Sequence, residues 1–213
     1  KTFKFGNSNA IIINDLDIKN KIIDYLFNSI SLSKFRYHML ENMSQLHLLK
    51  KNPHYVSPNF KGYNYFLIFK SFQNSQYCIA IDKKRLSYHR NKINVSNINL
   101  YKVKISCSMS MFQGSIFDCK LIRNKSNKYL MLIKDCYSLF GSQDITEMEL
   151  VEKMYYLNSI VNNQIHSCDN FQIKINKLYE YDDLENLVNT IIPKCSLDII
   201  GLCFYPKFSG ISI

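Results

Sequence analysis

Three short segments of the chain combine lysine or aspartate side chains with glycine, at residues 55–65, 114–141 and 198–206. Asp118 and Lys120 lie two residues apart, and alternate residues of a strand point to the same face of a sheet. Lys61 directly precedes Gly62 in the first segment. Lysine ammonium groups bind phosphate groups, whereas carboxylates hold divalent metal ions.

Each of these residues also has an ordinary structural interpretation. Lys61 could be a solvated turn lysine, and Asn59 could be a turn-forming residue before Gly62. Asp118 and Lys120 could pair with charges on a neighbouring strand. The sequence leaves these alternatives open.

The order and spacing of the three segments resemble the covalent nucleotidyltransferase superfamily. This group includes mRNA capping guanylyltransferases, nucleic-acid ligases and the cap-binding domain of snurportin. The resemblance covers about residues 54–207. In the active enzymes of the family, a lysine amine of a Lys-x-Asp-Gly motif attacks the α-phosphate of a nucleotide. Carboxylates of later motifs hold the metal ion and the ribose.

The matches to this family lie mainly at structural positions. With the chain aligned on Gly62, Asp118 falls in the third motif, and Asp135 is followed six residues later by Gly141. The fourth motif is represented by residues 201–204, Gly-Leu-Cys-Phe. The resemblance therefore implies the guanylyltransferase-like fold.

The departures fall at the chemical positions. Asn59 stands at the nucleophile position, Lys61 at the acidic position and Asn64 at the arginine position. Lys120 and Ile200 replace two glutamates. An amide nitrogen cannot act as an amine nucleophile, and the lost carboxylates leave few ligands for a divalent metal. The resemblance thus implies a nucleotide-shaped cleft, positively charged and without catalysis.

We therefore expect a catalytically inactive guanylyltransferase-fold module that binds a capped RNA 5′ end or a guanine nucleotide. We expect no catalytic residue, no metal site and no cofactor. The expected contact residues are Asn59, Lys61, Asn64, Asp118, Lys120, Asp135 and Lys207. Two alternatives stay open: an active, divergent mRNA guanylyltransferase that uses Mg²⁺ with Lys61 as a displaced nucleophile, and a structural subunit of a polymerase or capping complex.

The hydrophobic periodicity indicates which elements position these residues. Apolar residues at i+4 spacing predict a helix from Asp15 to Ile30, and a second stripe runs from Phe35 to Leu46. After Pro53 the period changes to two. The predicted strands are 63–69, 77–81, 86–89, 100–105, 115–122, 129–133, 171–179 and 197–205, with helices capped at Asp144 and over 182–192.

These elements predict an α+β fold of mostly antiparallel sheets with flanking helices. We expect an N-terminal helical segment at residues 1–50 and a guanylyltransferase-like domain at 54–213 that continues beyond Ile213. We expect the last strand, 197–205, to be buried on both faces. The helical stripes within 15–50 are candidate docking surfaces for protein partners.

Composition excludes several classes of protein. The 213 residues are 46% hydrophobic and 21% charged, typical of a globular chain, and no apolar run reaches the roughly 18 residues of a membrane span. Seven cysteines without metal-binding spacing indicate reduced thiols in an intracellular compartment, nuclear or cytoplasmic. The frequent lysine, asparagine and isoleucine residues fit an AT-rich virus or protist.

The net charge of +10 favours a polyanionic partner. However, 23 of the 27 basic residues are lysine, and asparagine is equally frequent at 23 residues. An AT-rich genome encodes such residues often, so codon bias accounts for part of the charge.

Overall fold

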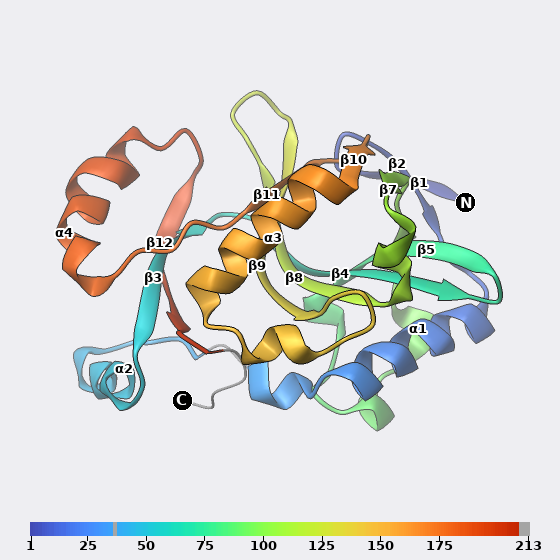
Figure 1. Cartoon of the computed structure of the whole chain (residues 1–213), viewed down its shortest axis with the longest axis horizontal. Coiled ribbons are helices and arrows are strands. Elements are labelled where there is room, and N and C mark those ends of the chain that lie inside the picture. The colour runs from blue at the N-terminus through green and yellow to red at the C-terminus, as the bar shows by residue number, and fades with distance from the viewer. Residues whose placement is uncertain (36–37, 209–213) are drawn as a thin grey trace.

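The segments with the strongest alternation of apolar residues form the middle of a large sheet. The computed structural model describes residues 1–35 and 38–208. The central strands are β4 (Tyr63–Phe72), β5 (Ser75–Asp82), β8 (Ser115–Arg123) and β9 (Tyr129–Ser138). The sheet has eight strands in the order β1-β2-β6-β5-β4-β8-β9-β11 (Figure 1). Among the described strands, only β11 (Gln172–Ile175) pairs in parallel, with β9, so the predicted α+β class with mostly antiparallel sheets is confirmed.

The first residues of the chain are strands rather than helix. β1 (Thr2–Phe5) and β2 (Ser8–Ile12) form a hairpin, and β2 pairs with β6 (Leu100–Lys102). The hairpin turns at Gly6, whose φ of +67° is in the region that glycine adopts without steric cost. The expectation of a helical segment from residue 1 is therefore wrong for residues 2–12, which complete one edge of the large sheet.

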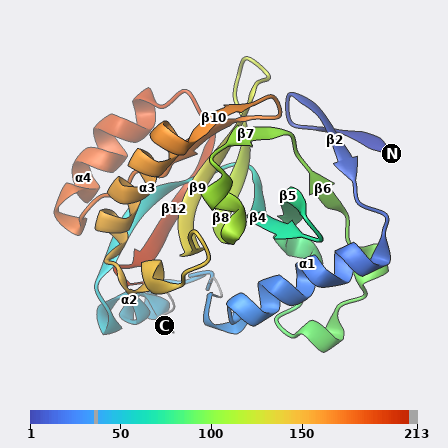
Figure 2. The ribbon, with the colours of Figure 1, turned by 45° about the vertical axis from the view of Figure 1, so that its right-hand side comes forward.

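The first amphipathic stripe forms the predicted helix. α1 (Leu16–Ser29) begins after Asp15, whose side chain accepts hydrogen bonds from two backbone N–H groups of the first turn. Ile22, Ile23 and Leu26 are fully buried on its inner face. They pack against the apolar side chains that β4, β5 and β8 present on one face of the large sheet (Figure 2). This packing is what holds the helix, since its polar outer face contributes little.

The second stripe, Phe35 to Leu46, does not form a packing helix. Residues 36–37 lie outside the described part of the chain, and the rest consists of short helical turns followed by α2 (Leu48–Lys51). Met39 and Met43 are 79% and 80% exposed. The side chain of Gln45 accepts hydrogen bonds from the backbone N–H groups of residues 41 and 42, which favours a local turn over a longer helix.

α3 (Leu150–Gln164) covers the opposite face of the large sheet from α1 (Figure 1). Its predicted cap, Asp144, belongs instead to a separate short turn at Asp144–Glu147. The carboxylate of Glu149 caps α3 by accepting from the N–H groups of Val151 and Glu152. Both Glu149 and Asp144 are acidic and precede apolar residues, so the sequence pattern marked the right region but the wrong residue.

A separate two-stranded sheet lies beside the large one. It pairs β3 (His54–Phe60) with β12 (Ile199–Pro206) in antiparallel fashion. β12 has no second strand neighbour in the described sheets, and Ile200 is 64% exposed. The expectation that this strand is buried on both faces is therefore wrong. A second small sheet pairs β7 (Ile105–Cys107) with β10 (Ile165–Cys168).

Two further predicted elements differ from the structure. Residues 86–89 form no strand and belong to a connection of bends and short turns between β5 and β6. The predicted strand 100–105 is divided between β6 and β7. The helix expected at 182–192 exists as consecutive helical turns from Tyr181 to Lys194, including α4 (Leu184–Asn186).

Two further observations concern the helices and the cysteines. Within residues 1–35 and 38–208, no helix combines the length and the apolar character that crossing a bilayer requires. All seven cysteines carry free thiols.

Candidate functional site

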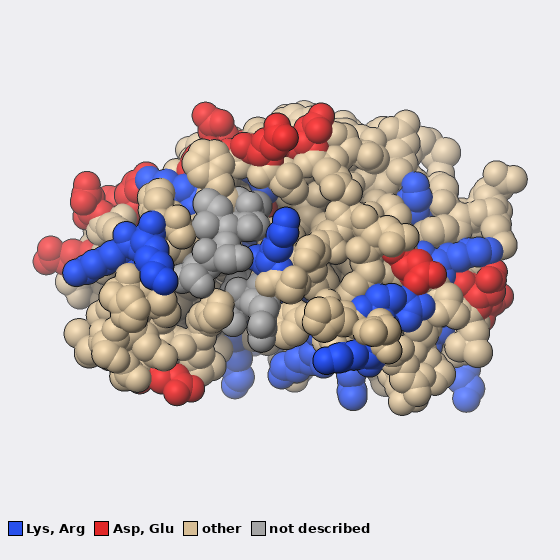
Figure 3. Space-filling model, turned by 90° about the horizontal axis from the view of Figure 1, so that it is seen from below, with Lys and Arg blue, Asp and Glu red and all other residues tan. Residues whose placement is uncertain are grey.

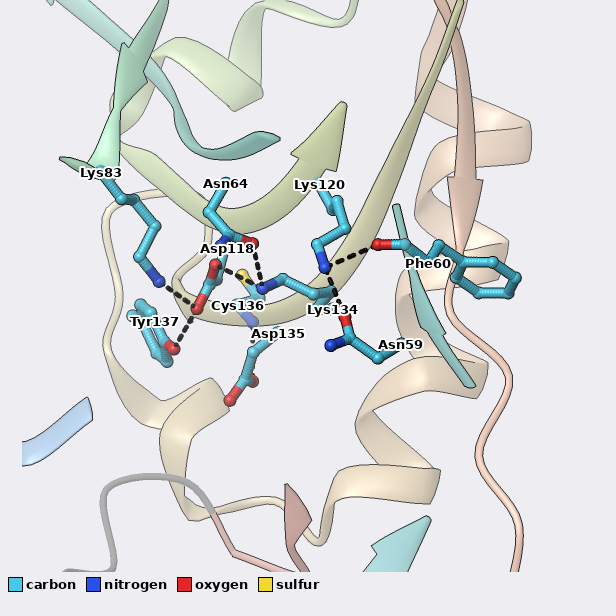
Figure 4. Close-up of polar contacts among 10 residues, drawn as sticks. All are labelled: Asn59, Phe60, Asn64, Lys83, Asp118, Lys120, Lys134, Asp135, Cys136 and Tyr137. Carbon is cyan, nitrogen blue, oxygen red and sulfur yellow. Dashed lines mark hydrogen bonds and ion pairs between the residues drawn. The ribbon is translucent and has the colours of Figure 1, made fainter. Parts of the chain in front are cut away.

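Two β-bulges in β9 shape the site. The register between β8 and β9 moves from Cys119↔Ile133 to Asp118↔Asp135, which leaves Lys134 as an extra residue. It moves again between Phe117↔Cys136 and Ile116↔Ser138, which leaves Tyr137 as a second one. A bulge redirects the side chain of its extra residue. Both extra residues turn toward the same carboxylate, that of Asp118 (Figure 4).

Asp118 is fully buried and is surrounded by donors. The Lys83 ammonium lies 2.9 Å from its Oδ2, and the Tyr137 hydroxyl donates to the same oxygen at 2.9 Å. The Lys134 ammonium lies 3.6 Å from Oδ1. Lys83 comes from the turn that follows β5, so three separate elements meet at this carboxylate (Figure 4).

Lys120 joins the two sheets. Its ammonium donates to the Asn59 amide oxygen at 2.6 Å and to the Phe60 backbone carbonyl at 2.8 Å, both on β3. Asn64 lies opposite Lys120 in the β4–β8 register, and its amide oxygen accepts from Lys134 at 3.0 Å. We call Lys83, Lys120 and Lys134, with Asn59, Asn64 and Asp118, the lysine cluster.

The lysine cluster holds more positive than negative charge. It contains three ammonium groups and one carboxylate, which Lys83 and Lys134 contact, and the side chains are mostly buried: 16% of Lys83 and 6% of Lys134 are exposed. Burial lowers the pKa of Lys83 and of Lys120, and the nearby Lys134 ammonium lowers both further. Buried like charges repel one another in a medium of low dielectric, so an added anion would stabilise the cluster.

The pKa of Asp118 reflects the same excess of positive charge. Burial by itself would raise the pKa of this carboxyl group. The ammonium groups of Lys134 and Lys83 outweigh burial and hold the pKa at about 2. The Asp118 carboxylate is therefore ionised at any physiological pH.

Asp135 belongs to a different contact. Its carboxylate accepts from the Lys153 ammonium at 2.7 Å and from the backbone N–H of Cys136 at 2.7 Å, and it is turned away from Asp118 (Figure 4). Lys153 is fully buried on α3 and also donates to the Cys136 carbonyl at 3.1 Å. This ion pair fastens α3 to the end of β9.

The residues present do not fit a divalent metal ion. The two carboxylates that match the family's metal-holding motifs, Asp118 and Asp135, are each bound by a lysine ammonium. A lysine at this distance repels a cation and occupies the oxygens that would ligate it. In the described part of the chain, no group of three or more His, Cys, Asp or Glu side chains is arranged to hold a metal.

Four of the seven expected site residues come together in the lysine cluster: Asn59, Asn64, Asp118 and Lys120. Lys61 lies next to it in the turn between β3 and β4, where its side chain is exposed and its backbone N–H donates to the Asp198 carbonyl. The turn itself is tight, because a Cβ on Gly62 would lie 2.4 Å from the Leu121 carbonyl oxygen.

The other two expected residues lie apart from the lysine cluster. Asp135 contacts Lys153, as described above. Lys207 is at the opposite end of the β3–β12 sheet from Asn59, where its ammonium contacts Glu180 at 3.0 Å and lies over the Tyr55 ring. The grouping of Lys207 with the cluster is therefore corrected, since an ion pair and a ring already hold it elsewhere.

Sequence reasoning missed four residues of this region: Lys83, Lys134, Tyr137 and Lys153. A partial signal exists for Lys134, which interrupts the apolar run of β9 beside Asp135. No pattern marks Lys83, because it stands in a polar turn where lysine is ordinary.

The comparisons with known proteins give a distant viral relative. No family model matches the chain. The chain is 22% identical over 197 residues to a protein of Acanthamoeba polyphaga mimivirus named "Uncharacterized protein L308". The match covers 90% of this chain and 58% of the viral protein, so the chain spans little more than half of that relative's length.

Proposed function

We propose that the lysine cluster binds the phosphate groups of a guanine nucleotide or of a capped RNA 5′ end, without covalent catalysis. The observation that carries the proposal is that three lysine ammonium groups lie in one cluster with a single carboxylate: Lys83 and Lys134 contact Asp118, and Lys120 contacts Asn59. Phosphate oxygens would take the place of neutral acceptors such as the Asn59 amide oxygen, because a lysine ammonium forms stronger hydrogen bonds with a charged acceptor.

The absence of catalysis follows from the chemistry of the first segment. Asn59 carries an amide at the position of the family's nucleophile, and it accepts a hydrogen bond from Lys120. Lys61 is exposed in the turn beyond it. Because the acidic positions hold lysines, Ile200 or lysine-bound aspartates, phosphate binding here proceeds without Mg²⁺.

A structural role is the competing function, and one observation favours it. Each lysine of the cluster already has a protein acceptor: Lys83 has Asp118, Lys120 has Asn59 and Lys134 has Asn64. A network satisfied in this way could serve only to join the β3–β12 sheet to the large sheet. The chain would then be a scaffold of a larger assembly, and no nucleotide would bind.

Calorimetric titration separates the two functions. GTP, a cap dinucleotide and inorganic tripolyphosphate are titrated into the wild type and the Lys120→Gln and Lys125→Gln variants, without Mg²⁺. Lys125 is an exposed lysine of the β8–β9 hairpin and serves as the matched control. Loss of one charge-assisted hydrogen bond, about 1.5–3 kcal/mol, should weaken binding about tenfold or more in Lys120→Gln only. Equal affinities in all three proteins, or no binding, would favour the scaffold.

A further inference from the structure

The connection between β5 and β6 carries a concentration of basic residues. Segment 83–92 has the sequence Lys-Lys-Arg-Leu-Ser-Tyr-His-Arg-Asn-Lys, with five lysine or arginine residues and no acidic one. Lys84, Arg85 and Lys92 are exposed. The face of the molecule seen from below, where α1 lies, shows groups of Lys and Arg side chains along its lower part (Figure 3).

This segment starts at the lysine cluster. Its first residue, Lys83, reaches inward to Asp118, while the residues that follow run over the surface. Arg90 also points inward, where it bonds to Asp24 and Asn20 on α1 and so anchors the far half of the segment. Lys83 pairs with Asp118, and Arg90 pairs with Asp24. The positive charge on the exposed side of the segment therefore comes from Lys84, Arg85 and Lys92.

The segment also lines a polar hollow. A hollow of about 610 Å³ lies between its second half and the end of α1. Asn28, Ser29 and Ser31 line one side, and Tyr88, His89 and Asn91 line the other. Tyr88 is 46% exposed at this hollow. Amide and hydroxyl groups beside an accessible aromatic ring suit a nucleobase, which offers both a hydrogen-bonding edge and a stacking face.

We propose that segment 83–92 is a binding track for single-stranded RNA that continues from the bound 5′ phosphates. The direction of the track rests on the proposed function, because Lys83 connects the segment to the cluster. Lys84, Arg85 and Lys92 contact the phosphate backbone, and an unpaired base enters the hollow and stacks on Tyr88. A duplex does not fit this role, since its bases already stack on one another.

The test uses fluorescence anisotropy with the whole chain and a 12-nucleotide RNA that carries a 5′ triphosphate and a 3′ dye. The triple variant Lys84→Glu, Arg85→Glu, Lys92→Glu is compared with Lys50→Glu, Lys51→Glu, Lys125→Glu. The control reverses the same number of exposed charges away from the segment, so net charge changes equally. We expect at least tenfold weaker RNA binding in the first triple variant and less than threefold in the control.

Salt dependence gives a second readout. Removal of three phosphate contacts should flatten the plot of log affinity against log salt by about 2, at about 0.7 per contact for a single strand. Tyr88→Ala should weaken RNA binding at least about fivefold, and Tyr88→Phe should restore it, because a phenyl ring still stacks. The proposed track would be wrong if both triple variants lost RNA affinity equally, or if polyglutamate displaced the labelled RNA more strongly than unlabelled RNA did.

The same proteins distinguish this inference from the proposed function. GTP is too short to follow the track, so the first triple variant should bind GTP within twofold of the wild type. If GTP binds normally and RNA affinity is unaffected by the triple variant, the track is wrong and the proposed function stands. If RNA binds through Lys84, Arg85 and Lys92 but GTP binds nowhere, the track stands and the cluster assignment fails.

Discussion

The Lys120 ammonium lies 2.6 Å from the Asn59 amide oxygen, so an amine from β8 stands beside the residue that the resemblance to covalent nucleotidyltransferases puts at the position of their lysine nucleophile. Substitution of Asn59 by aspartate tests this contact. A carboxylate at this position would form an ion pair with Lys120 and neutralise the charge that attracts phosphate. We expect GTP affinity to fall several-fold in Asn59→Asp and to change less in Asn59→Ser. Calorimetric titration measures both, and tighter binding in Asn59→Asp would contradict the assignment of Lys120.

Covalent labelling tests the absence of catalysis. The wild type, incubated with α-labelled GTP and Mg²⁺, should give no labelled band after denaturing electrophoresis, because Asn59 cannot attack phosphorus and Asp118 and Asp135 are bound by lysines. A labelled band that disappears in Lys61→Ala would instead identify an active guanylyltransferase with a displaced nucleophile.

Acid unfolding tests the electrostatics of Asp118. Its pKa is about 2 in the folded chain, below the 3.8 of an unperturbed aspartate, so the folded state favours the ionised form. The resulting stabilisation is present above pH 4 and is lost as the pH falls toward 2. The difference between these two pKa values corresponds to roughly 2–3 kcal/mol. Urea unfolding between pH 7 and pH 2 should show this loss in the wild type and in Asp24→Asn, and a smaller one in Asp118→Asn.

The turn at Gly62 should tolerate no side chain. A Cβ there would lie 2.4 Å from the Leu121 carbonyl oxygen, and backbone cannot move away as a flexible side chain can. Gly62→Ala should therefore lower the melting temperature by several degrees, and Gly62→Val by more. The neighbouring Lys61→Ala provides the control, since its side chain is exposed. Equal melting temperatures in all four proteins would argue against this tight approach.

Lys153 and Asp135 should depend strongly on each other in stabilising the protein, because they form a mostly buried ion pair. Removal of one partner leaves the other charged and poorly solvated, which costs about 3–5 kcal/mol. We expect Lys153→Met to destabilise the protein by this amount in urea unfolding, and Lys153→Met with Asp135→Asn to recover part of it. A double variant as unstable as the sum of the single ones would show that the two side chains act independently.

The sequence predicts the elements in which local pattern and tertiary packing agree. α1 follows its apolar periodicity because it buries one regular face, and β4, β5 and β8 follow their apolar runs because helices cover both faces of the sheet. β1 and β2 were missed because their short hairpin carries polar residues at a sheet edge. The stripe from Phe35 to Leu46 differs from its prediction for another reason: Met39 and Met43 have the right spacing but are 79% and 80% exposed.

The candidate site could be predicted only in part for a similar reason. Asp118 and Lys120 could be predicted to share a face, because both lie on β8 and alternate residues of a strand point to the same side. The contacts of Lys134 and Tyr137 depend on two bulges, and a bulge changes the face on which a side chain emerges without a clear sequence pattern. Lys83 reaches Asp118 from another element, so its role depends on the fold as a whole.

A crystal structure of the protein with GTP, grown without divalent metal, tests the central claim most directly. We predict that the phosphate oxygens lie within hydrogen-bonding distance of the Lys83, Lys120 and Lys134 ammonium groups, with Lys120 released from Asn59. Nucleotide bound elsewhere, with the contact between Lys120 and Asn59 intact, would contradict the account.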